Sequence, residues 1–183
     1  MRNFVALLTL VAANAAFAQH DGHSHQPQPS GYAGMHTREI KALSPEQVAD
    51  LREGRGMGAS LPAELNGAPG PMHVLELSQQ LKVTAEQRAA LERVKSEMKT
   101  SAQQLGAQVI AAEAALDDGF KTATIDEKGI GDATARIAAL QGQLRAVHLT
   151  AHLKTKQVLT GEQIMAYNQA RGYSTPGEGT HRH

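Results

Sequence analysis

The chain has 183 residues, 41% of them apolar, and its 18 Lys and Arg balance 18 Asp and Glu. A neutral chain without a basic block is not typical of a dedicated nucleic-acid binder. The absence of cysteine excludes disulfides, iron–sulfur clusters, thiolate zinc sites and cysteine nucleophiles. With 3 Phe, 3 Tyr and no Trp, the core must be aliphatic, which favours a thin helical bundle over a β-sandwich.

Residues 1–18 have the pattern of an export signal. A positively charged start precedes an apolar run, residues 4–13, that is too short to span a bilayer. Small residues at Ala16 and Ala18 then form a cleavage pattern. We expect cleavage after Ala18, no later membrane span, and a soluble protein located in the periplasm.

Two polar segments flank the remaining chain. Residues 19–34 and 174–183 are too polar to bury a core, so we expect them to be disordered tails around one domain, residues 35–173. They carry most of the histidines, which could chelate a metal only loosely. These tail histidines are His20, His23, His25, His181 and His183.

Similar helix-start signals recur along the domain. Leu43–Gln47, Val83–Gln87 and Leu159–Gln163 each place Ser or Thr at a helix N-cap and Gln three residues later, which is a capping box. Thr124–Glu127 supplies a fourth box, with Glu in the last place. These signals indicate helices that begin after each box.

Three short helical segments are expected first, over residues 45–53, 61–65 and 72–82. The first and third carry apolar residues at helical spacing, and the second is a brief turn. The glycine-rich loop Gly54–Gly58 lies between the first two. It lacks the Lys-Ser/Thr of a phosphate-binding loop and follows no strand, so phosphate binding is not expected.

Two long helices are expected to carry the fold. Apolar residues advance by threes and fours from Leu91 to Leu116 and again from Ile130 to Val158, so each series makes one apolar stripe. The short break at residues 117–124 makes the two helices antiparallel neighbours. The predicted fold is therefore all-α, a long antiparallel hairpin with short flanking helices. Its exposed edge leads us to expect a homodimer.

One pair of histidines stands out on the second long helix. His148 and His152 are four residues apart, so their rings share a helix face beside the apolar stripe. Because the flanking leucines make this helix apolar on a second side, another helix should pack there. The best candidate is the segment 72–82, which offers His73 and Glu76 on one face.

These four side chains form a candidate metal site. Imidazole nitrogens and a carboxylate suit Zn(II), Cu(II), Ni(II) or Co(II). The alternative is that the paired histidines are ordinary surface or interface residues. No nucleophile motif is present, and Leu149 occupies the position of the zincin glutamate, so nothing supports an enzyme.

The repeated boxes carry a family resemblance. Leu43-Ser44-Pro45-Glu46-Gln47 and Leu159-Thr160-Gly161-Glu162-Gln163 match an L-[ST]-x-x-Q motif, and Val83–Gln87 matches except for its first residue. A small exported helical protein with such boxes, over residues 35–173, resembles the Spy/CpxP group of periplasmic stress proteins. The resemblance implies a helical-hairpin protomer, often an antiparallel dimer.

The resemblance implies two kinds of function. Metal-sensing members bind nickel, cobalt, zinc or copper through helix histidines, which His148 and His152 resemble, with His73 as the partner. The chain departs from that pattern because Leu77 stands four residues after His73 and because no membrane anchor follows the signal. Chaperone members hold unfolded clients on a concave helical face without ATP.

Two functional hypotheses follow. The first is a metal sensor, buffer or resistance factor, with a membrane-anchored regulator as one conceivable partner. The second is an ATP-independent chaperone for unfolded proteins. A structural or adaptor protein with neither activity is the third alternative. The chaperone's client-binding side chains would be Leu149, Leu153, Met98, Lys95 and Lys99.

Overall fold

The computed structural model describes residues 30–173. The expected signal peptide and the tail histidines fall in residues 1–29 and 174–183, outside the described residues. Contacts divide the chain after Ala33, and residues 30–33 form a turn closed by a 2.8 Å bond from Ala33 N to Ser30 O. From Gly34 onward the described chain is helical and contains no strand.

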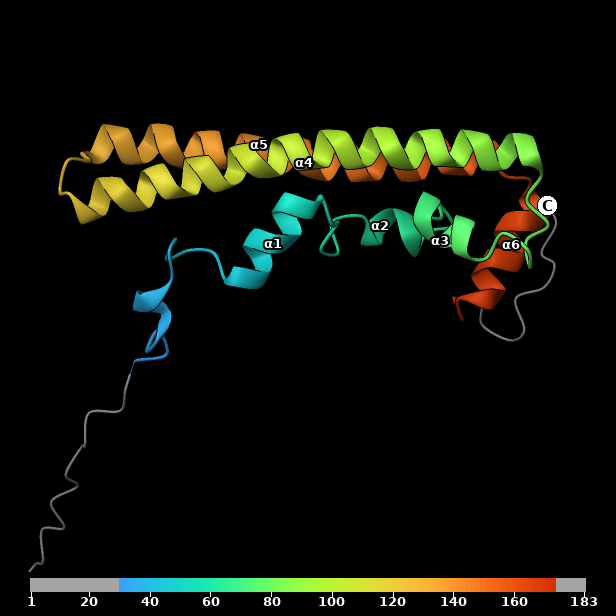
Figure 1. Ribbon diagram of the computed structural model, residues 1–183, viewed down its shortest axis with the longest axis horizontal. Helices are drawn as coiled ribbons and strands as arrows, with labels where there is room; N and C mark the ends of the chain where they lie inside the picture. The colour runs from blue at the N-terminus through green and yellow to red at the C-terminus, as the bar shows by residue number, and fades with distance from the viewer. Residues whose placement is uncertain (1–29, 174–183) are drawn as a thin grey trace, which may run out of the picture. The chain divides into compact units, whose positions relative to one another are not determined.

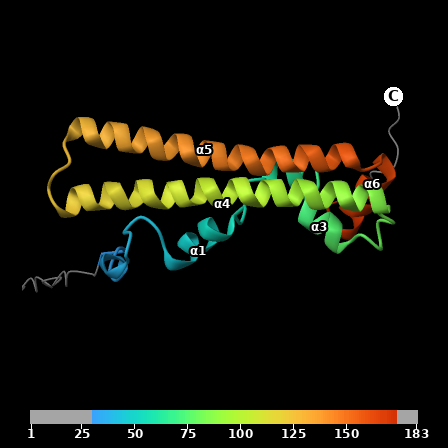
Figure 2. The same cartoon turned by 45° about the horizontal axis from the view of Figure 1, so that its top comes forward.

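A long helical hairpin organises the domain, as predicted. Helix α4, Ala85–Lys121, packs along helix α5, Glu127–Val158 (Figures 1 and 2). Helix α4 continues to Lys121, although the break at residues 117–124 suggested that it would end earlier. Helix α5 is capped by Asp126, whose side chain accepts from Gly129 N, and not by Thr124. Aspartate is an equally strong cap and stands next to the first helical residue.

Short helices lie on one side of the hairpin. In chain order they are η1 (Met35–Thr37), α1 (Pro45–Glu53), α2 (Leu61–Glu64) and α3 (Pro71–Glu76), and α6 (Gly161–Ala170) follows the hairpin (Figure 1).

The third short helix ends earlier than predicted. It was expected over residues 72–82, but Leu77 leaves the helical conformation, with ψ at 12°. A separate turn follows and closes through a 2.9 Å bond from Val83 N to Ser78 O, with Lys82 at a positive φ of 50°. This six-residue closure around a left-handed residue is a common helix-end motif.

Two of the predicted capping boxes clasp each other. In each box the glutamine oxygen accepts from the amide of its own N-cap residue, at 3.1 and 3.0 Å. The amide nitrogen of Gln87 also donates to Gln163 Oε1, at 2.8 Å, and Gln163 donates back at 2.9 Å. The amide nitrogen of Gln87 donates its second hydrogen to Val158 O, and that of Gln163 donates its second hydrogen to Leu81 O. The clasp thus joins the starts of α4 and α6 and uses donors that glutamate lacks.

Two apolar clusters stabilise this arrangement. One joins α1 to the hairpin through Leu51, Ala102 and Leu144, and the other joins α3, α4 and α6 through Val74, Leu91 and Tyr167. The first requires a glycine, because a Cβ on Gly106 would lie 2.1 Å from Leu51 O. None of the described helices is both long and apolar enough to span a bilayer.

Candidate functional site

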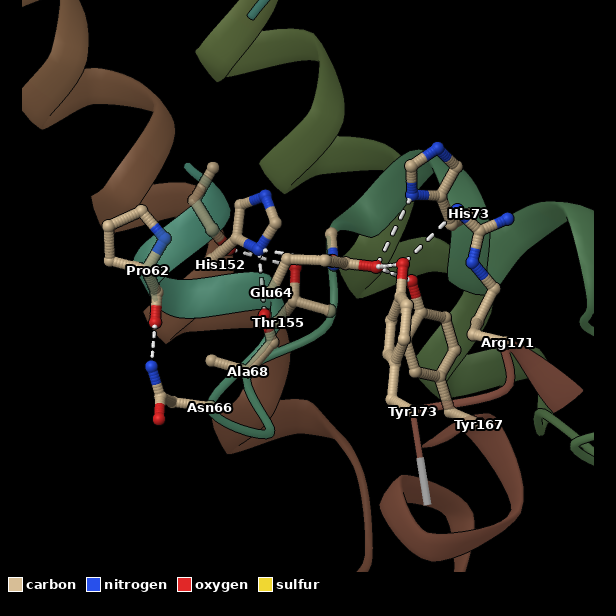
Figure 3. Close-up of polar contacts among 12 residues, drawn as sticks. Pro62, Glu64, Asn66, Ala68, His73, His152, Thr155, Tyr167, Arg171 and Tyr173 are labelled. Carbon is tan, nitrogen blue, oxygen red and sulfur yellow. Dashed lines mark hydrogen bonds and ion pairs between the residues drawn. The ribbon is translucent and has the colours of Figure 1, made fainter. Parts of the chain in front are cut away.

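A buried carboxylate lies where α2, α3, α5 and α6 meet. It is Glu64, the last residue of α2 (Figure 3), and this residue is 6% exposed. Its Oε2 accepts from Gly70 N at 3.1 Å, and its Oε1 accepts from the hydroxyls of Tyr167 and of Tyr173, the latter at 3.2 Å. Burial and the bond to Glu64 raise the pKa of the Tyr167 hydroxyl, which therefore stays protonated as a donor.

Two of the predicted ligands flank this carboxylate. His73 Nδ1 lies 3.8 Å from Glu64 Oε1, and His152 Nδ1 lies 3.5 Å from Oε2. Imidazoles far apart in the sequence therefore meet one acidic side chain, but each faces a different oxygen of it (Figure 3). The Nδ1 atom of His73 is buried and has no hydrogen-bond partner among the described residues.

The contacts of His152 fix which of its nitrogens is free. Its Nδ1 lies 2.7 Å from Ala68 O, and a carbonyl oxygen only accepts, so Nδ1 carries the proton. The lone pair of the neutral ring is then on Nε2. The backbone of Gly70 covers this side of the ring, because a Cβ on Gly70 would lie 3.1 Å from Nε2.

His148 is buried one helical turn before His152. It is 4% exposed, and its Nε2 has no hydrogen-bond partner among residues 30–173. The ring lies under the loop between α1 and α2, where a Cβ on Gly56 would be 3.4 Å from Nδ1. Burial, and secondarily the nearby His152, lower the pKa of His148, so the neutral imidazole is favoured.

The four predicted ligands are therefore not gathered at one point. Glu76 is exposed and makes no ion pair or hydrogen bond with another described residue. Within residues 30–173, no group of three or more His, Cys, Asp and Glu side chains has the spacing to hold a metal ion. The structure instead places two imidazoles one helical turn apart on α5. His148 Nε2 has no partner among the described residues, and His152 has its lone pair on Nε2 and the carboxylate of Glu64 near its Nδ1.

Sequence reasoning missed the carboxylate and the glycines around it. Glu64 ends a helix of 4 residues, too short to show a periodic pattern, and its tyrosine partners lie more than 100 residues away. The available signal was the cluster of glycines on both sides of α2. Gly56 and Gly70 approach the two imidazole rings at distances that leave little room for a side chain.

The other side of the hairpin carries a shallow groove. It has a volume of about 410 Å³ and is lined by α4 and α5 alone. A 3.1 Å ion pair between Lys154 and Glu97 joins the two helices there. Of the predicted client-binding residues, Met98 lines the groove, while the others lie elsewhere. The groove's apolar side chains are Val94, Met98, Leu105, Ala146, Val147 and Ala151.

Comparison with known proteins gives one match. The model of the LTXXQ motif family matches residues 71–171, which is more than half of the chain. The matched region begins at α3 and ends after α6, so it contains the hairpin, both clasped boxes and His148 with His152. No curated protein and no solved structure matches the chain significantly.

Proposed function

The chain belongs to the LTXXQ motif family, and we propose that this small helical protein binds a transition-metal ion through His148 and His152. The supporting observation is that the Nε2 atom of His148 is buried without a hydrogen-bond partner among the described residues, while the bond from His152 Nδ1 to Ala68 O leaves the lone pair of that ring on Nε2. A buried polar atom without a partner costs free energy, and a cation bound to His148 Nε2 would remove that cost.

The surroundings of His152 support this proposal. A ligating imidazole commonly donates its other N–H to a carbonyl or carboxylate, which orients the ring. His152 Nδ1 has both acceptors near it, Ala68 O at 2.7 Å and Glu64 Oε2 at 3.5 Å. Glu64 would thus orient a ligand, and neither His73 nor Glu76 would belong to the ligand set.

The chemistry of the donors limits the ion. Two neutral imidazoles suit Zn(II), Cu(II), Ni(II) or Co(II), and water would complete the coordination. The predicted export signal at residues 1–18 supports a periplasmic location, where the protein would act as a sensor, buffer or resistance factor. Its partners would be a second copy of the chain or a membrane-anchored regulator.

Calorimetric titration of the full chain with each of these four ions tests the proposal. The tail histidines are first changed to asparagine so that only the domain is measured. His148→Ala/His152→Ala should abolish binding, while His36→Ala, at an exposed position, should not change it. Affinity should fall as the pH drops, because ligand imidazoles must be neutral, and the lowered pKa of His148 places the protonation of that ring below pH 6.5. Unchanged affinity in the double variant would rule out the pair as the site.

The apolar groove favours a second function, the holding of unfolded proteins without ATP. It offers apolar surface on a side of the hairpin that no other described helix lines. Met98→Asp, in the lining of the groove, should weaken the suppression of aggregation of a reduced client protein. Met165→Asp is the matched control, because Met165 is 65% exposed on α6 and does not line the groove. Equal suppression by both variants would count against the groove.

A further inference from the structure

Glu64 connects the histidine pair to the last residues that the structure describes. Its Oε2 faces His152 Nδ1 at 3.5 Å, while its Oε1 accepts the tyrosine hydroxyls from the C-terminal side of the chain (Figure 3). A single carboxylate therefore contacts α5 through one oxygen, and through the other it contacts α6 and Tyr173, which lies three residues beyond the end of α6.

The two tyrosines on this carboxylate are held very differently. Tyr167 is fully buried in the cluster with Val74 and Leu91. Tyr173 is 36% exposed and lies beyond the end of α6. It is held by its hydroxyl bond to Glu64, by a 2.8 Å bond from its N–H to Asn168 O, and by contact with a neighbouring arginine. The hydroxyl bond can therefore be removed without opening the core.

We propose that Glu64 is a positioning residue that couples cation binding by His148 and His152 to the docking of Tyr173. This inference rests on the proposed metal-binding function. Coordination at Nε2 makes the Nδ1–H of His152 a stronger donor, and the charged carboxylate is a stronger acceptor than the carbonyl of Ala68. The hydroxyls on Oε1 hold the carboxylate in the orientation that receives this bond.

Such coupling must act in both directions. If the docked Tyr173 hydroxyl strengthens cation binding, then the bound cation strengthens the docking of Tyr173 by the same factor. The tyrosines themselves can report this, because the chain has no Trp and only 3 Tyr. With Tyr32→Phe, both remaining tyrosines are partners of Glu64, so their emission reports on this one carboxylate.

The experiment titrates Zn²⁺ into the full chain carrying Tyr32→Phe and asparagine at the tail histidines. Tyrosine emission should change in step with binding measured by calorimetry. Glu64→Gln should weaken binding by roughly 10- to 100-fold, and Tyr173→Phe by roughly two- to fivefold. In the Glu64→Gln background, Tyr173→Phe should have no further effect, because Tyr173 acts through Glu64.

The outcomes separate the two proposals. If Zn²⁺ binds and depends on His148 and His152, but Glu64→Gln and Tyr173→Phe leave both affinity and emission unchanged, the coupling is wrong and the metal site remains. If Zn²⁺ binds neither the chain with an intact site nor any of the variants, the proposed metal site and the proposed coupling are both wrong. Should Glu64→Gln lose its helical circular dichroism, Tyr173→Phe still decides the question, because that position is exposed at the end of the described chain.

Discussion

The two ends of the helical hairpin differ in what covers them. Between residues 110 and 136, around the turn, no residue is buried, and Phe120 is 60% exposed. From the middle of the hairpin to its other end, α1, α2, α3 and α6 add further helices, and the buried side chains there include two histidines and a glutamate. Two packed helices alone bury too little surface to enclose polar chemistry. The short helices create the site by burying imidazoles that the hairpin would leave in water.

The largest expected effect compares two helical glycines, Gly106 in the covered part of the hairpin and Gly131 near the turn. Gly106→Ala should destabilise the protein by about 3 kcal/mol, because the new Cβ would lie 2.1 Å from Leu51 O and would push α1 off α4. Gly131→Ala, at the bare end, meets nothing within 4 Å and should stabilise the helix by up to about 1 kcal/mol. Urea denaturation followed by circular dichroism measures both. Equal effects would mean that α1 is not tightly packed in solution.

A smaller effect is expected from the glutamine clasp. Gln163→Glu removes the two hydrogen bonds that its amide nitrogen donates, to Leu81 O and to Gln87, and should cost about 2 kcal/mol.

Gln47→Glu is the control for the clasp. Its box is capped in the same way, but Gln47 is exposed, and glutamate serves equally well in a capping box. This change should stay within about 0.5 kcal/mol. Thermal unfolding of the two variants under one condition gives the comparison, and a similar loss in both would show that capping alone explains the motif.

The smallest expected effect concerns pH. The pKa of His148 is lowered from 6.5 in the folded chain, so below that pH the unfolded chain binds a proton that the folded chain resists. Stability should therefore decline as the pH falls below 6.5, and His148→Leu should make that decline shallower.

Denaturation at several pH values, with a chelator present, measures this slope. His36→Leu provides the control at an exposed histidine and should leave the slope unchanged. If His148→Leu behaves like this control, the ring of His148 is protonated as easily in the folded chain as in the unfolded one.

The sequence predicted those parts of the molecule that local rules determine. The apolar stripes predicted the hairpin, and the boxes at Ser44, Thr84 and Thr160 predicted three helix starts that the structure confirms. Helix ends were predicted less well, because nothing in the sequence of residues 77–82 indicates that the backbone of Lys82 is left-handed.

The candidate site was only partly predictable. The pairing of His148 with His152 follows from helical spacing alone. The place of Glu64 does not, because its burial depends on Tyr167 and on a loop glycine that meet it only after the chain has folded. His73 was expected beside the pair, and it instead faces the opposite oxygen of that carboxylate.

The reciprocal bond between Gln87 and Gln163 also bears on how related sequences can diverge. Each side-chain amide donates a hydrogen bond to the oxygen of the other, so a substitution at one position leaves the remaining glutamine without a hydrogen-bond partner across the clasp. Descendants of this chain should therefore keep both glutamines or lose them together. A lone replacement would be tolerated only with a second, compensating change on the facing helix.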